Sequence, residues 1–268
     1  MSALSRLPIG HYIAKPSVIH QLDPRVKIVL LLACLSLIFM ANSFLSFTVA
    51  IGFVVLLFAT AQISIIYMFR ALKPLWILLI ITFIFHLFLN REGTVLIEWG
   101  ILRVYEQGVI QGIVVTLRIL LLILLSSLLT LTTKPLVLTD GLEKLMSPLK
   151  VFRFPAHEIA LMISISLRFI PTLLQEMDKI MKAQSARGAS FQSRSLKKKA
   201  TAFMAILIPL FIASFQRADE LALAMEARGY RGGEGRTQYR KLRVTQLDYM
   251  AISVVIAFGA LFLLLRAW

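Results

Sequence analysis

Long apolar stretches constrain this chain more than any other feature of its sequence. The segment GVIQGIVVTLRILLLILLSSLLTL at 108–131 carries a single charged residue, Arg118. About 20 mostly apolar residues are enough to cross the hydrocarbon core of a bilayer as a helix. Further apolar stretches begin at residue 23 and cover about 44–61, 75–89 and 245–265. The sequence therefore predicts an all-α integral membrane protein with about five transmembrane helices.

The composition agrees with this class of protein. Of the 268 residues, 58% are hydrophobic and 16% are charged, whereas soluble domains average about 45–50% and about 25%. The formal net charge of +15 also raises nucleic acid as a partner. A membrane protein with large cytoplasmic segments is expected to be basic as well, so we expect the lipid bilayer and no nucleic acid as a partner.

Lysine and arginine residues orient the predicted spans, because they are enriched on the cytoplasmic side of membrane proteins. Residues 134–243 hold 19 of the 29 Lys and Arg residues, and Arg6, Lys15, Arg25 and Lys27 lie before or at the start of the first span. We therefore expect a multi-pass protein of a prokaryotic cell membrane. Its N-terminus would lie in the cytoplasm and its C-terminus outside.

This orientation divides the chain into three predicted parts. Residues 1–133 form a membrane domain with the first four spans, residues 134–243 form a cytoplasmic domain, and residues 244–268 form the final transmembrane helix. Within the first part, TVLIEWGILRVYE at 94–106 is predicted to form a small external β-hairpin about Gly100.

The predicted cytoplasmic domain is too long and too periodic to be an ordinary loop. Apolar residues recur at helical spacing, which predicts long amphipathic helices at about 156–187 and 196–228 and a shorter one at about 139–150. Each long helix ends in the same three residues. These are Ala186, Arg187 and Gly188 in the first, and Ala227, Arg228 and Gly229 in the second.

An Ala-Arg-Gly end has two interpretations. Glycine just after a helix can take the left-handed conformation that closes it, and arginine in the last turn complements the helix dipole. Alternatively, each arginine extends from a slim tip and binds a carboxylate of a partner through its planar guanidinium. The residue types alone leave both interpretations open.

Several segments resemble the transmembrane T component of energy-coupling factor (ECF) transporters, a CbiQ-like scaffold. They are the two Ala-Arg-Gly ends, HQLDPRVKIVLLL at 20–32 and SLRFIPTLLQEMDKIMKAQSARG at 166–188. The resemblance implies a non-catalytic scaffold of an ABC importer that couples ATP hydrolysis to vitamin uptake. It implies that residues 134–243 are a coupling domain, whose two arginine tips dock into two ATP-binding cassette ATPases. A small membrane subunit that binds the substrate is the third implied partner.

The sequence lacks the motifs of a self-sufficient enzyme. No G-x-x-x-x-G-K-[ST] phosphate loop occurs, and YRGGEGR at 230–236 lacks its lysine and hydroxyl. We therefore expect no cofactor, metal site or catalytic residue in this chain, and we assign ATP and Mg²⁺ to partner ATPases. Two alternatives are a membrane-embedded enzyme acting on lipid-like substrates and a self-sufficient carrier. The first would need a polyacidic metal site, and the second would need internal repeats or broken helices.

Overall fold

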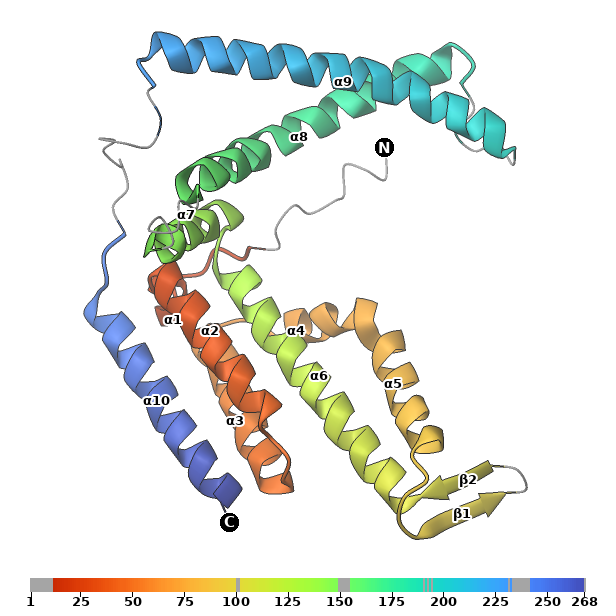
Figure 1. Ribbon diagram of the computed structural model, residues 1–268, viewed down its shortest axis with the longest axis vertical. Coiled ribbons are helices and arrows are strands. Elements are labelled where there is room, and N and C mark those ends of the chain that lie inside the picture. Colours follow the sequence, from red (N-terminus) through yellow and green to blue (C-terminus); the bar gives the residue numbers. More distant parts are fainter. Residues whose placement is uncertain are drawn as a thin grey trace. The chain divides into compact units, whose positions relative to one another are not determined.

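The structure is a computed structural model that describes residues 12–99, 102–148, 155–189, 191, 193, 195–230, 232 and 242–267. The first half contains α1 (Val18–Gln21), α2 (Pro24–Phe39), α3 (Phe44–Thr60), α4 (Ile65–Leu72), the 3₁₀ turn η2 (Lys73–Leu75) and α5 (Trp76–Leu89). Strands β1 (Val95–Trp99) and β2 (Leu102–Tyr105) follow. The rest contains α6 (Glu106–Thr132), α7 (Pro135–Met146), α8 (Ala156–Ala186), α9 (Leu196–Ala227) and α10 (Gln246–Ala267) (Figure 1).

The predicted all-α membrane class is confirmed, because five helices of the described residues are long and apolar enough to cross a membrane. They are Ile66–Leu89, which joins α4 to α5, and helices α6, α8, α9 and α10. The set differs from the predicted spans in its members. Helices α2 and α3 have only 16 and 17 residues, at the short end of the range for a span. Helices α8 and α9, which we predicted to be cytoplasmic, meet the criteria of length and composition.

The described residues fall into two compact units. The core unit contains residues between 10 and 141 and between 242 and 268, and the α8–α9 unit contains residues between 142 and 241. In the core unit, α2, α3, α6 and α10 pack around one cluster of buried apolar side chains. Its largest fully buried side chains are Phe262, Ile38, Leu121 and Val54.

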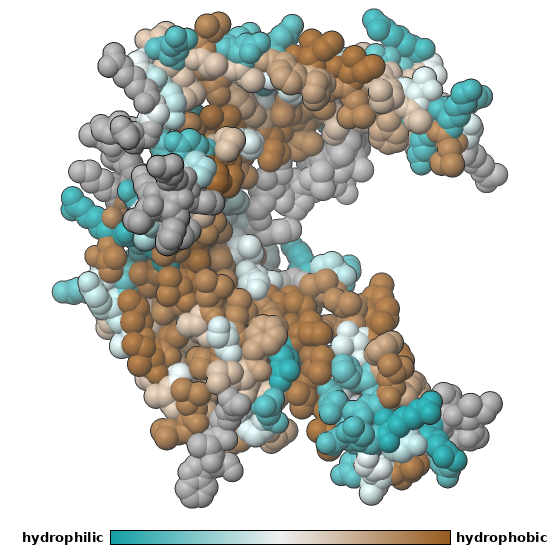
Figure 2. Space-filling view, viewed as in Figure 1, coloured by the Kyte–Doolittle hydropathy of each residue, from teal (hydrophilic) through white to brown (hydrophobic). Residues whose placement is uncertain are grey.

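Apolar side chains also cover the outside of the core unit. Phe44, Ile77 and Ile256 are among the large apolar residues that are mostly exposed, and Figure 2 shows extensive apolar surface over the helices of this unit. A soluble protein rarely exposes so much contiguous apolar surface. Hydrocarbon chains are the environment that such a surface suits.

Two glycines let α6 approach α5 closely. A Cβ atom on Gly108 would lie 3.1 Å from the carbonyl oxygens of His86 and Leu87, and one on Gly112 would lie 3.2 Å from the ring of Phe83. Small residues four positions apart are a common device for close packing of membrane helices. This G-x-x-x-G pair therefore fixes the contact between the two helices.

Two local predictions can be compared directly with the structure. The β-hairpin is confirmed, since β1 and β2 pair antiparallel with Glu98 opposite Arg103; Gly100 lies outside the described residues. The short helix predicted at 139–150 begins earlier, because α7 starts at Pro135. Proline suits the first position of a helix, where its missing N–H is not needed.

Candidate functional site

Helix α8 ends in a closed turn at Arg187. The backbone of Arg187 has φ −86° and ψ 9°, and Gly188 follows with φ +88°. The Gly188 amide donates to the carbonyl of Ser185 at 3.0 Å, and the Ala189 amide donates to that of Gln184 at 2.9 Å. This pair of hydrogen bonds around a left-handed residue is the Schellman motif of helix ends.

Helix α9 ends in the same way at Arg228. Its backbone has φ −88° and ψ 8°, and Gly229 follows with φ +73°. The Gly229 amide donates to the carbonyl of Glu226 at 2.8 Å, and the Tyr230 amide donates to that of Met225 at 3.0 Å. The two Ala-Arg-Gly ends are therefore one structural motif built twice, which we call the arginine tips.

The glycines of the arginine tips are needed for their left-handed backbone conformation and not for lack of space. A Cβ atom added at Gly188 or Gly229 would meet nothing within 4 Å, so no neighbour excludes a larger residue. The left-handed conformation, however, costs other residues about 1–2 kcal/mol. Glycine therefore closes each helix and leaves the tip slim, as its neighbours Ala186 and Ala227 also do.

The two arginine side chains have no partner in the described part of the chain. Both residues are exposed, as are Ala186 and Ala227 beside them. Neither guanidinium makes a hydrogen bond or ion pair with another described residue. Arginine carries five N–H donors in a planar fork, so each tip presents this fork outward.

The arginine tips lie far apart. Helix α9 has 32 residues and is therefore about 48 Å long. The segment from Arg187 to Ser195 spans at most about 29 Å even when fully extended. The tips are thus separated by about 20 Å or more, and Figure 1 shows α8 and α9 ending at opposite sides of their crossing. One binding site on a partner could not hold both.

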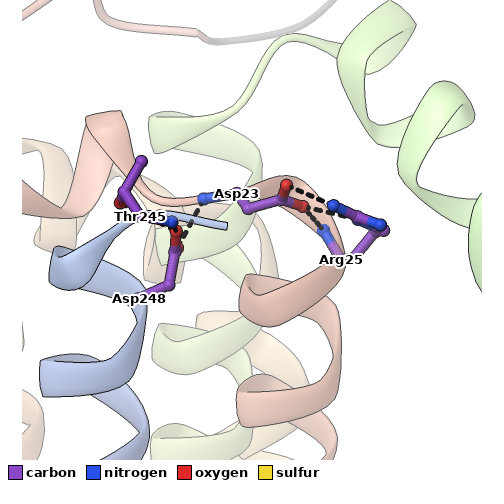
Figure 3. A network of polar contacts seen from close by, with 4 residues as sticks. All are labelled: Asp23, Arg25, Thr245 and Asp248. Carbon is purple, nitrogen blue, oxygen red and sulfur yellow. Dashed lines mark hydrogen bonds and ion pairs between the residues drawn. The ribbon is translucent and has the colours of Figure 1, made fainter. Parts of the chain in front are cut away.

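A polar cluster at the start of α2 and α10 is a second conspicuous feature, here called the polar clamp (Figure 3). Asp248 has no exposed surface, and its carboxylate accepts hydrogen bonds from the Asp23 amide at 2.7 Å and the Thr245 amide at 2.6 Å. Asp23 in turn accepts from the amide and the guanidinium of Arg25. The clamp holds the first turns of α2 and α10 together.

The sequence predicted only part of this polar clamp. Asp23 before Pro24 is a local signal for a helix start, since aspartate is a common N-cap and proline suits the first helical position, and α2 begins in this way. Asp248 was missed, although TQLD at 245–248 has the spacing of a capping box, in which a Thr and an acidic residue satisfy each other at a helix start. Its second contact, to the Asp23 amide, has no signal in the sequence.

Lys27 joins two further helix ends beside the clamp. It is only 7% exposed, and its ammonium donates to the carbonyls of His20 and Thr132 and to the hydroxyl of Thr133 at 2.9 Å. A cation at the C-terminal end of a helix complements its exposed carbonyls. Lys27 therefore ties α2 to the ends of α1 and α6.

Arg118 lies within the apolar run of α6, where a charge exposed to lipid would be costly. The structure gives it partners within the protein. Its guanidinium donates to the carbonyl of Ala41 at 2.6 Å and to the side chain of Asn42 at 3.2 Å. Arg118 thus attaches the middle of α6 to the turn between α2 and α3.

The histidines described in the structure lie in separate places. The His157 ring lies 2.9 Å from Glu143 of α7, and the His20 ring contacts Ser17 and the carbonyl of Ile13. Burial and the nearby Lys27 and Lys15 charges lower the pKa of His20 below its ordinary value. Among the residues described, no three His, Cys, Asp or Glu side chains are placed to share a metal ion.

Comparison with known proteins gives one consistent match over almost the whole chain. Residues 15–239 match the family model CbiQ, described as a cobalt transport protein. The chain is 49% identical to the energy-coupling factor transporter transmembrane protein EcfT of Brevibacillus brevis over 260 residues, which cover 96% of this chain and 98% of the relative. It is 45% identical to that of Bacillus subtilis over 259 residues, 97% and 98% of the two chains. It is 48% identical to that of Acidaminococcus fermentans over 263 residues, 98% of each.

These relatives match in length as well as in sequence, over nearly the whole of this chain. The function predicted from the sequence is thereby confirmed at the level of the subunit. This chain belongs to the CbiQ family and is the non-catalytic, multi-pass transmembrane T component of an energy-coupling factor transporter.

Proposed function

We propose that the arginine tips are docking points for two ATP-binding cassette ATPases. In this proposal, Arg187 and Arg228 each bind a carboxylate in a groove of one ATPase. Ala186, Gly188, Ala227 and Gly229 keep the tips slim enough to enter. The chain itself binds neither ATP nor Mg²⁺, and the partner ATPases bind and hydrolyse the nucleotide.

One observation carries this proposal: the same helix end occurs twice, and both arginines are exposed without a partner among the described residues. A purely structural arginine would act on the carbonyls of its own last turn. No described hydrogen bond joins either guanidinium to those carbonyls. The separation of the tips also favours two partner sites over one.

The proposed mechanism is mechanical. Binding of ATP draws the two ATPases together, and because each holds one tip, α8 and α9 move relative to each other. The exposed apolar face of α9, which includes Phe203, Leu207 and Phe211, packs against a small membrane subunit that binds the substrate. Its movement changes the orientation of that subunit, which supports uptake of a vitamin or a metal ion.

The proposal places α8 and α9 on the cytoplasmic side, although both could span a bilayer by length and composition. Lys197, Lys198 and Lys199 in the first turn of α9 favour this side. A topology reporter inserted near Ser193 should therefore read cytoplasmic, and one fused after Trp268 should read external. If α8 and α9 both crossed the membrane, the first reporter would read external while the second stayed unchanged.

The main experiment replaces the two arginines singly and together. A desolvated arginine–carboxylate contact at an interface costs about 2–5 kcal/mol when one partner is truncated, whereas a helix-end charge contributes about 0.3–1 kcal/mol. Arg187→Ala and Arg228→Ala should each weaken co-purification of ATPase subunits or uncouple ATP hydrolysis from uptake. The double variant should abolish transport. Lysine should rescue poorly, since it keeps the charge but loses the fork.

Lys182→Ala and Arg168→Ala are the matched controls, because both residues are exposed cations of α8 away from its tip. They should assemble and transport like the parent. Membrane insertion and size-exclusion profiles should be the same for all variants. If both single arginine variants assemble and transport normally, the tips serve only to end their helices and the docking proposal is wrong.

A further inference from the structure

An apolar groove with a volume of about 430 Å³ lies inside the core unit, between α2, α3, α6 and α10. Its size falls within the range of about 300–1,000 Å³ that small-molecule sites occupy. The walls include Leu31 and Cys34 of α2, Leu57 of α3, Leu128 of α6 and Ala251 of α10. Almost all of the lining is hydrocarbon.

The polar side chains of the lining have their donor groups already bonded within the protein. The hydroxyl of Thr60 donates to the carbonyl of Leu57 at 3.0 Å, and that of Thr132 donates to Leu128 at 2.8 Å. The three protons of the Lys27 ammonium are taken up by its three acceptors. A vitamin or a metal ion needs placed polar groups for recognition, so the groove suits a hydrocarbon occupant.

The groove exists because α10 is attached to the rest of the unit at two separate points. At its start, Asp248 belongs to the polar clamp. Further along, Phe258 stacks on Phe53 with ring centroids 3.9 Å apart, and a Cβ atom added at Gly259 would lie 3.4 Å from the side chain of Leu37 of α2. Ten residues, or about 15 Å of helix, separate Asp248 from Phe258. This length equals about half of the hydrocarbon thickness of a bilayer, the depth of one leaflet.

The mouth of the groove is basic. Leu22, Lys27, Thr60 and Thr132 line one end of the groove, here called its mouth, where α2 and α10 begin and α3 and α6 end. Near these helix ends lie Lys15, which donates to the carbonyl of Gln62 after α3, and Lys134, which follows Thr133 in the chain; Arg25 is also near but is paired with Asp23. Basic residues at this level of a membrane protein attract the phosphate of lipid head groups.

We propose that this groove binds one acyl chain of a membrane phospholipid, with the lipid phosphate at the basic mouth. The hydrocarbon lining, the depth of one leaflet and the charge of the mouth each match one part of that molecule. The bound chain fills the space between the two attachment points of α10. It thereby completes the packing of the core unit, independently of the arginine tips and of any ATPase.

Native mass spectrometry of the full chain, with all subunits that co-purify, tests this site with dioleoyl phosphatidylglycerol as the probe. Ala251→Phe places a ring in the groove, and Ala257→Phe places the same ring on an exposed position of α10 that does not line it. The parent and Ala257→Phe should retain one lipid more than Ala251→Phe does. Equal lipid retention by all three proteins would overturn the proposal.

Cys34 provides an independent readout, because it lines the groove and is the only cysteine of the chain. Its reaction with N-ethylmaleimide should slow about tenfold when phosphatidylglycerol is present at ten times its dissociation constant. The control is Cys34→Ala combined with Ala257→Cys, whose thiol lies outside the groove and should react at a rate that lipid changes little. The same slowing at both positions, or none at Cys34, would show that lipid does not enter the groove.

Discussion

The core unit and the α8–α9 unit place their apolar residues in opposite ways. The buried apolar cluster belongs entirely to the core unit, where α2, α3, α6 and α10 surround it. Helices α8 and α9 together have 63 residues, yet the residues they bury are Ala156, Ala160, Ala202 and Ile206. Their larger side chains, such as Phe211 and Phe215, are mostly exposed.

This difference separates what holds each unit together. The core unit has its own buried cluster and its own polar attachments, so substitutions there should change the stability of the chain. The α8–α9 unit has little buried surface of its own, and exposed apolar patches of this kind mark surfaces for partners or lipid. Substitutions in α8 and α9 should therefore change assembly more than stability.

Asp248→Ala should give the largest loss of stability. The substitution removes the acceptor of three hydrogen bonds and leaves the buried Asp23 amide without its partner. Because an unsatisfied buried group costs about 1–3 kcal/mol and bonds to charged groups contribute about 1.5–3 kcal/mol, we expect a loss of about 3 kcal/mol. Thermal unfolding of the purified chain measures it.

Asp219→Ala is the matched change in the other unit, since Asp219 is exposed on α9. Exposed substitutions usually change stability by less than about 0.5 kcal/mol. If both variants lower the unfolding temperature equally, the contrast between the two units is wrong.

Gly108→Ala should destabilise the chain by about 1–3 kcal/mol, the usual cost of overpacking. The new methyl group would lie 3.1 Å from two backbone carbonyl oxygens of α5, which cannot move aside as a side chain could. Gly52→Ala in α3 is the control, because a Cβ atom there meets nothing within 4 Å. Alanine in a helix interior is about 0.5–1 kcal/mol better than glycine, so this control should be neutral or stabilising in the same unfolding measurement.

The sequence predicted those features that depend on local pattern. Apolar runs indicated the membrane class, and the repeated Ala-Arg-Gly indicated where α8 and α9 end, because a glycine stop is encoded within a few residues. Asp248 and Lys27 acquire their roles only through residues about 100 or more positions away, at Asp23 and Thr132. The acyl-chain groove arises from a gap between helices, which no single helix encodes.

The feature that was hardest to predict is which helices are long and apolar enough to span a membrane. Hydropathy alone does not separate an amphipathic helix with an uncharged middle from a span, and α9 has no charged residue between Lys199 and Arg217. Conversely, α2 is short. It ends with Met40 as its C-cap, and the guanidinium of Arg118 donates to the carbonyl of Ala41 in the turn that follows. A contact from the middle of another helix thus marks the end of α2.

Gly188→Ala should cost about 1–2 kcal/mol locally, from the left-handed backbone at φ +88° rather than from any clash. The cost falls on the last turn of α8, so the tip should fray while the unfolding temperature of the core unit stays unchanged. Hydrogen exchange of the Ala189 amide, which donates to Gln184, measures the fraying. Gly188→Asn should recover part of the protection, since asparagine tolerates this conformation better.

The smallest expected effect concerns the ion pair that joins the two long helices. Arg217 of α9 bonds Glu176 of α8, and their side chains are 29% and 24% exposed. The Arg103–Glu98 pair of the β-hairpin is more exposed, at 56% and 57%. Since solvent screens exposed pairs and leaves most of them worth about 0–1 kcal/mol, we expect a coupling of about 0.5–1 kcal/mol for the first pair and less for the second.

A double-mutant cycle with Glu176→Gln and Arg217→Gln isolates this coupling from the effects of each residue alone. The readout is the protease resistance of the α8–α9 unit. Because this unit lacks a large buried cluster of its own, one half-buried ion pair contributes a larger fraction of its stability than it would in the core unit. The coupling should shrink in high salt, as for any partly exposed pair. A coupling near zero, with transport intact in the double variant, would mean that apolar packing alone holds α8 against α9.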